Sequence, residues 1–265
     1  MPTYTITLQG PDGSTERLLY DPHASLLTHE DGRPVDLSPA GFVYADEERE
    51  WDTATAVSPD QPGRKTHSVR KLKVSLGFRC NYSCAYCDQA SQVGQEEPTD
   101  LADVGQFLAN LDSWWDGGRD GKGTGTNVQF WGGEPFVYWK KLKPLAEGIK
   151  ARRPNAELSV ITNGSVLDEE RIDWLDRLDF AVAVSHDGPG QALRGPDPFD
   201  DPEKAAAIRA LFARLHPKGK VSFNVVLTRD HHSLAAARQW FVESMGDHDL
   251  RPENWSRMNE RVRLI

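Results

Sequence analysis

The feature that most constrains the fold is an alternation of short apolar runs with longer amphipathic stretches between Leu72 and Met245. Five runs have the length and composition of buried strands, and each precedes a stretch with helical spacing of its apolar residues. The expected strands cover 73–78, 128–131, 158–162, 180–185 and 221–227, and the expected helices 98–111, 137–152, 168–178, 201–215 and 233–245. Strands that alternate with helices pair in parallel and carry the helices outside. The sequence therefore predicts an α/β domain built on a parallel sheet.

Short polar motifs follow four of these strands. They are Cys80-Asn81-Tyr82-Ser83-Cys84-Ala85-Tyr86-Cys87, Gly132-Gly133-Glu134-Pro135, Thr162-Asn163-Gly164 and Ser185-His186-Asp187-Gly188. In barrels of parallel strands, the reactive groups lie where strands end and helices begin. We therefore expect the four motifs to converge on one rim of the domain.

All three cysteines of the 265-residue chain lie in the first motif, at Cys80, Cys84 and Cys87. Thiolates at this spacing let one short loop wrap an iron–sulfur cluster. Three thiolates on four irons leave one iron open for substrate or cofactor. Two other interpretations stay open at this point: one buried face of a helix, and a zinc site completed by a distant histidine. An odd number of closely spaced cysteines argues against a disulfide framework and for a reducing cytoplasm.

The first 63 residues follow a different pattern. Thr3–Gln9 alternates as a strand, and two more short strands are expected before residue 30. This segment carries twelve acidic residues against three arginines, whereas residues 64–79 carry six basic residues and no acid. We predict a small β-rich appendage with its linker over 1–63 and the main domain over 64–265. The basic segment is interpreted as a solvated linker or as a surface for an anionic cofactor or an acidic peptide.

Composition excludes several classes of partner. The longest apolar runs fall far short of the roughly 20 residues that span a bilayer, so no membrane partner is expected. A formal net charge of −9 provides no field for binding long nucleic acid. The glycine-rich run 116–126 lacks the GxxxxGK[ST] pattern and precedes a strand, so a flexible connection is expected there and not a phosphate-binding loop.

The motifs together resemble those of the radical S-adenosylmethionine (radical SAM) enzymes: CxxxCxxC after the first strand, in register with Gly-Gly-Glu-Pro, Thr-Asn-Gly and Ser-x-Asp-Gly-Pro. The resemblance covers about residues 71–265 and is greatest to the peptide- and protein-modifying branch. It implies a partial (β/α)6 TIM-like barrel of parallel strands, here with a small N-terminal β-rich appendage. It also implies a 4Fe–4S cluster whose open iron chelates S-adenosylmethionine, and an external one-electron donor. The cleaved cofactor then yields methionine and a 5′-deoxyadenosyl radical that abstracts hydrogen from the substrate.

The resemblance also implies roles for individual residues. Cys80, Cys84 and Cys87 are expected to ligate the cluster. The expected cofactor-binding residues are Tyr86, Gly132, Gly133, Glu134, Asn163, Ser185, Arg194, Asn224 and Leu227. Tyr86 is expected near the adenine, and the two glycines let the backbone approach the amino group of the cofactor. Glu134 either accepts from that amino group or holds its loop, and no residue is assigned as catalytic.

The implied function is hydrogen abstraction from a side chain of a peptide or protein substrate, such as a short precursor peptide. One alternative is a radical enzyme of the same core that acts on a small molecule. Another, from a different class, is a non-catalytic zinc or electron-transfer iron–sulfur module. A core of this family has six strand–helix units, and five are complete here. We therefore expect 261–265 to form a short parallel strand beside 221–227, and the natural protein to continue beyond it.

Overall fold

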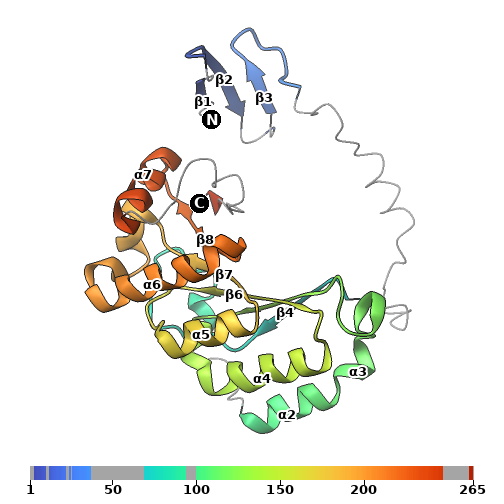
Figure 1. Cartoon of the computed structure of the whole chain (residues 1–265). Coiled ribbons are helices and arrows are strands. Elements are labelled where there is room, and N and C mark those ends of the chain that lie inside the picture. The colour runs from blue at the N-terminus through green and yellow to red at the C-terminus, as the bar shows by residue number, and fades with distance from the viewer. Residues whose placement is uncertain are drawn as a thin grey trace. The chain divides into compact units, whose positions relative to one another are not determined.

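The computed structural model describes residues 3–9, 12–21, 24, 26–36, 69–93, 100–246 and 263–264. The chain divides into two compact units, Met1–Lys65 and Thr66–Ile265. Figure 1 shows both, with the N-terminal strands in blue. The expected boundary between residues 63 and 64 lies outside the described residues. No helix in the described part is both long and apolar enough to span a bilayer.

The N-terminal unit contains an antiparallel sheet of β1 (Tyr4–Gln9), β2 (Thr15–Asp21) and β3 (Leu26–His29), in that order. The turn between β1 and β2 contains Gly13 at a φ of 81°, a value that favours glycine. In that turn the side chain of Asp12 accepts from the Ser14 N–H. The expected β-rich appendage is thus present.

The second unit is built on a parallel sheet whose strands follow chain order. These strands are β4 (Lys71–Ser75), β5 (Asn127–Trp131), β6 (Glu157–Thr162), β7 (Ala181–Ser185) and β8 (Val221–Asn224). Right-handed crossovers between sequential parallel strands place every connecting helix on the same face of the sheet. Figure 1 shows the helices gathered on that face. The architecture is therefore α/β, a partial TIM-like barrel, as the sequence predicts.

Six α-helices are described in this unit, and a side-chain N-cap begins four of them. The six helices are α2 (Leu101–Ala109), α3 (Leu111–Trp114), α4 (Trp139–Arg152), α5 (Glu169–Arg177), α6 (Pro202–Leu215) and α7 (Leu234–Met245). The side chain of Asp100 accepts from the N–H groups of Ala102 and Asp103, which starts α2. Asp201 caps α6 in the same way, with Pro202 in the first turn.

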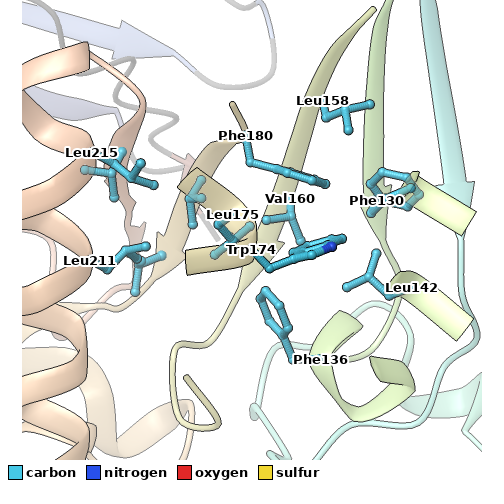
Figure 2. Close-up of a cluster of buried hydrophobic side chains, with 14 of the residues drawn as sticks. Phe130, Phe136, Leu142, Leu158, Val160, Trp174, Leu175, Phe180, Leu211 and Leu215 are labelled. Carbon is cyan, nitrogen blue, oxygen red and sulfur yellow. The ribbon is translucent and has the colours of Figure 1, made fainter. Parts of the chain in front are cut away.

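The hydrophobic core lies between the sheet and these helices. Figure 2 shows Trp174 of α5 surrounded by side chains from the strands and from α4, among them Phe180, Leu142 and Val160. The rings of Trp174 and Phe180 are 4.8 Å apart, and Trp174 is 2% exposed. Alternate residues of each strand face this core, and the residues between them lie on the opposite face of the sheet.

Two strands differ from the expected bounds. The first was expected at 73–78, but β4 ends at Ser75. Gly77 adopts a φ of 130°, and the backbone N–H of Arg79 donates to the Tyr138 hydroxyl at 2.7 Å. Tyr138 lies 59 positions after Arg79 in the sequence, so no local sequence pattern predicts this hydrogen bond. The last strand, expected at 221–227, is interrupted at Val225 into β8 and β9 (Val226–Leu227).

The short strand β10 (Arg263–Leu264) pairs in parallel with β9, with Arg263 opposite Val226. This is the pairing expected for 261–265, observed at the two residues that the structure describes there.

The glycine-rich run is not a loose connection. The carboxylate of Asp120 accepts from the backbone N–H of Lys122 at 2.8 Å and from the Thr124 hydroxyl at 2.7 Å. It also accepts from the side-chain amide of Asn155 at 2.7 Å. The expected flexible connection is therefore a loop organised around one aspartate.

Candidate active site

A cavity of about 670 Å³ lies where the strands β4 to β8 end. Eleven of the twelve residues that the sequence singles out line it: Cys80, Cys84, Tyr86, Cys87, Gly132, Gly133, Glu134, Asn163, Ser185, Arg194 and Asn224. The expected convergence of the four motifs on one rim is therefore observed.

Leu227 is the one expected site residue that does not line this cavity. Leu227 is 6% exposed and is not one of the described residues that line the cavity, whereas its neighbour Val226 is. Successive side chains of a strand point to opposite faces, so Asn224 and Val226 share one face and Leu227 points away from it.

The cysteine motif is a loop with turns and not a helix, which eliminates the buried helical face as an explanation of the spacing. All three thiols are free. The backbone N–H of Tyr82 approaches the Cys80 sulfur at 3.3 Å. Burial raises the pKa of Cys80 and of Cys84, so a metal that binds these sulfurs must displace their protons.

A single metal ion gains no support from the geometry. Among the described residues, no three His, Cys, Asp or Glu side chains come together as ligands of one ion. Zinc holds its ligands within about 2.0–2.3 Å, so its donors must converge on one point. The thiolates of a cluster bind separate irons and need only surround a common volume, as the lining of the cavity by all three cysteines allows.

Gly132 and Gly133 are required by a close approach of two backbone segments. A Cβ on Gly132 would lie 2.3 Å from the carbonyl oxygen of Gly77, and one on Gly133 would lie 2.2 Å from that of Arg79. The Gly133 N–H donates to the Gly77 carbonyl at 2.9 Å. The glycines thus allow the end of β5 to pack against the segment that precedes Cys80, a reason additional to the one that the sequence suggested.

Glu134 holds the ends of two strands together. Its side chain is 1% exposed and accepts from the Phe136 N–H at 3.1 Å, the Thr162 hydroxyl at 2.8 Å and the Asn163 N–H at 2.7 Å. Burial raises its pKa to about 7, and these three hydrogen bonds oppose the shift. Of the two roles expected for Glu134, holding the loop is the one that these contacts describe.

Asn163 links the end of β6 to the cysteine loop. Its Nδ2 donates to Asn81 Oδ1 at 2.9 Å and lies 3.9 Å from the Cys80 sulfur. Its Oδ1 accepts from the N–H of Ser165 at 3.0 Å and from its hydroxyl at 2.6 Å. Asn81 Nδ2 donates to Ser165 Oγ at 2.8 Å, which closes the network. Sequence reasoning missed Asn81 and Ser165, although Asn81 lies inside a rim motif and Ser165 directly follows one.

Arg194 lines the cavity while forming a buried ion pair. Its Nη2 donates to Asp187 Oδ1 at 2.9 Å, and its guanidinium lies 5.6 Å from the centre of the Tyr86 ring. The Tyr86 hydroxyl donates to the other oxygen of Asp187. The Arg194 Nε is buried and has no hydrogen-bond partner among the described residues. This arrangement leaves one guanidinium N–H without an acceptor among the described residues.

A second cavity of about 390 Å³ lies along the same strands. Arg70, Lys71 and Lys220 line it, as does Glu157. Asn224 lines both cavities. The described part of the basic segment 64–79 thus contributes two cationic residues, Arg70 and Lys71, to the second cavity. It contributes none to the lining of the cavity beside the cysteines.

Comparisons with known proteins identify the same family as the motifs do. The model of the radical SAM superfamily matches residues 74–233, more than half of the 265-residue chain. The radical SAM cyclopropyl synthase TigE of Paramaledivibacter caminithermalis is 23% identical over 61% of this chain and 36% of its own length. The GTP 3′,8-cyclase of Desulforamulus reducens is 27% identical over 64% of this chain and 51% of its own. The chain thus spans about a third to a half of these relatives.

The fold has a counterpart among solved structures. That of native anSMEcpe with bound AdoMet and the Kp18Cys peptide superposes with a TM-score of 0.50 at 20% identity, over 71% of this chain and 57% of that one. This likeness shows the fold. Together with the superfamily match, it confirms the resemblance that the four motifs indicate. The chain belongs to the radical SAM superfamily, whose members are enzymes that use a 4Fe–4S cluster and S-adenosylmethionine.

Proposed function

We propose that this chain is the core of a radical SAM enzyme that holds a 4Fe–4S cluster through Cys80, Cys84 and Cys87 and binds S-adenosylmethionine in the adjoining cavity. The observation that supports it best is the convergence of three free thiols with eight of the nine expected cofactor-binding residues on one cavity. Cysteine thiolates are the donors that such clusters take. Three of them leave one iron for the cofactor.

The side chains around the cavity have separable tasks in this proposal. Arg194 offers an N–H that lacks a partner among the described residues, which suits the carboxylate of the cofactor. Tyr86 presents an aromatic ring at the wall, and the Asn163 network fixes the cysteine loop. When bound, the reduced cluster supplies the electron that cleaves the cofactor to methionine and a 5′-deoxyadenosyl radical. The protein positions these groups and limits access of water to them.

For the substrate, we propose a side chain of a peptide or protein, such as a short precursor peptide. The set of rim motifs is most similar to that of the peptide-modifying branch. The N-terminal sheet adds a surface suited to an extended chain. Ile6 and Leu8 on β1 are exposed, and β1 lies at an edge that pairs with no other described strand. An extended peptide can add to such an edge through backbone hydrogen bonds.

A small-molecule substrate is the second candidate, because several of the relatives are GTP 3′,8-cyclases. The two candidates are distinguished by turnover. With reductant and S-adenosylmethionine, a true substrate raises 5′-deoxyadenosine formation above the uncoupled rate and, when deuterated, transfers deuterium to it. We expect this response to peptides encoded beside the gene and not to GTP. Stimulation by GTP alone would establish the second candidate.

The cluster itself is tested by anaerobic reconstitution. We expect about four irons and four sulfides per chain, and 5′-deoxyadenosine after addition of reductant and S-adenosylmethionine. Cys84→Ala leaves two thiolates in the loop, so it should lose both the cluster and the cleavage activity. A wild-type protein that takes up one zinc and no sulfide would instead identify a structural metal module.

A further inference from the structure

Asp187 does not belong to the described lining of the cavity, yet its carboxylate holds three groups that do. Oδ1 accepts from the Arg194 guanidinium and from the backbone N–H of Val226, both at 2.9 Å. Oδ2 accepts from the Tyr86 hydroxyl. Tyr86, Arg194 and Val226 all line the cavity. One carboxylate thus lies behind three parts of the wall.

These three groups come from separate segments of the chain. Tyr86 lies within the cysteine loop, Arg194 follows the 3-10 helix η5 (Gly188–Leu193), and Val226 begins β9. A further bond, from the Ala85 N–H to the Leu193 carbonyl at 2.8 Å, joins the first two segments. The Asp187 carboxylate therefore connects the cysteine loop, through Tyr86, to the segments that contain Arg194 and Val226.

The position of Asp187 is itself fixed. The side chain is 3% exposed, and its backbone N–H donates to Gln191 Oε1 at 3.2 Å. Gln191 also accepts, through its backbone carbonyl, from the Arg194 N–H at 2.8 Å. A buried carboxylate with a guanidinium partner and two further donors has its charge compensated, whereas loss of one member leaves the other charge buried without compensation. The pair is thus held in one arrangement.

We propose that Asp187 is a positioning residue, which locks Tyr86 of the thiolate loop and the guanidinium of Arg194 into one arrangement around the cavity. The inference rests on the proposed function, because the anion expected at Arg194 is the carboxylate of S-adenosylmethionine. With one N–H committed to Asp187, the guanidinium has a defined orientation. The part of this side chain that lines the cavity is thereby held in place.

The test uses Asp187→Asn in the reconstituted full chain. The amide has the shape of the carboxylate but neither its charge nor its full set of acceptors. We expect the iron and sulfide content of the wild type, because the cysteines are intact, and a dissociation constant for S-adenosylmethionine raised about 10- to 100-fold in equilibrium dialysis, the usual effect of removing an outer partner of a ligating group. The change that the cofactor causes in the electron paramagnetic resonance spectrum of the reduced cluster should weaken accordingly.

Tyr86→Phe and the double variant separate the two partners of Asp187. Tyr86→Phe removes only the hydroxyl, so its effect on affinity should be smaller, and combining it with Asp187→Asn should cost less than the sum of both. Asp173→Asn is the matched control, because Asp173 forms an exposed ion pair with Arg214 on the helical face. It should bind the cofactor as the wild type does.

The outcomes distinguish this inference from the proposed function. A wild-type chain that takes up no cluster overturns the proposed function, and with it the role of Asp187 toward the cofactor. A wild-type chain that binds cluster and cofactor, beside an Asp187→Asn variant of equal affinity and unchanged spectrum, overturns the inference alone. A second result would also overturn the inference alone. In it, Asp187→Asn loses iron in proportion to its affinity for S-adenosylmethionine while Tyr86→Phe changes neither, because the role of Asp187 is then structural.

Discussion

Two buried carboxylates stabilise the rim of the cavity through different partners. Among the described residues, Glu134 accepts only from neutral donors, and burial raises its pKa to about 7. Asp187 faces the guanidinium of Arg194. An ion pair compensates the desolvation of a carboxylate, whereas amides and hydroxyls compensate it only in part. The stability contributed by Glu134 should therefore depend on pH near neutrality.

We predict this dependence for the metal-free protein. The pKa of Glu134 is about 7 in the folded chain against an ordinary value of 4.5, so between these pH values the folded state binds more protons than the unfolded one. The free energy of unfolding should consequently fall as pH rises from about 4.5 to 7. Glu134→Gln should not show this fall in the free energy of unfolding with pH. It should also be destabilised by about 1–3 kcal/mol, because its amide cannot accept a hydrogen bond from each of the three donors.

Urea unfolding across this pH range measures both effects. Glu243→Gln on the exposed face of α7 is the matched control, and its curve should run parallel to that of the wild type. Parallel curves for Glu134→Gln and the wild type would show that Glu134 does not titrate in this range.

A second prediction at this scale concerns Asn163. Asn163→Ala removes the hydrogen bonds to Asn81 and Ser165, each worth about 0.5–1.5 kcal/mol, and frees the loop that begins at Cys80. We expect the reconstituted cluster to be lost to a chelator several-fold faster than in the wild type. Asn110→Ala, at an exposed helix end, should not change the rate of loss. Equal rates for both variants would remove Asn163 from the support of the loop.

At the scale of elements, local patterns located the strands and helices to within a few residues, since periodicity and caps are local. What they missed depended on distant contacts. The end of β4 is set by Tyr138, and the requirement for Gly132 by Gly77. The strand ends brought eleven expected site residues together because a parallel sheet aligns them. Asp187 was not among the expected site residues, because its partners Tyr86 and Val226 are far away in sequence.

The close approach of β5 to the cysteine segment gives an element-scale prediction. Gly132→Ala places a methyl group 2.3 Å from the Gly77 carbonyl oxygen at a backbone φ of 135°, so it should destabilise by several kcal/mol and reduce cluster uptake. Gly105→Ala in α2 has no atom within 4 Å of the new Cβ and should stabilise by about 0.5–1 kcal/mol. Thermal unfolding and iron content measure the contrast. A Gly132→Ala variant as stable as the wild type would show that these segments can separate at little cost.

At the scale of the whole molecule, the two units should contribute to different steps. Every expected site residue belongs to Thr66–Ile265, whereas the exposed strand proposed to receive a peptide belongs to Met1–Lys65. The two units thus allow cofactor cleavage to be separated from substrate capture by single substitutions in the full chain.

The prediction uses Ile6→Asp on β1, with Val242→Asp on α7 as its control, because the two side chains are equally exposed at 38% and 39%. Surface changes of this kind alter the free energy of unfolding by about 0.5 kcal/mol or less, so both variants should remain folded. Both should form 5′-deoxyadenosine at the wild-type rate without substrate. Only Ile6→Asp should weaken the stimulation by peptide, because a charge on this face opposes an apolar partner. Equal stimulation of both variants would remove β1 from the peptide-binding surface and leave recognition to the second unit.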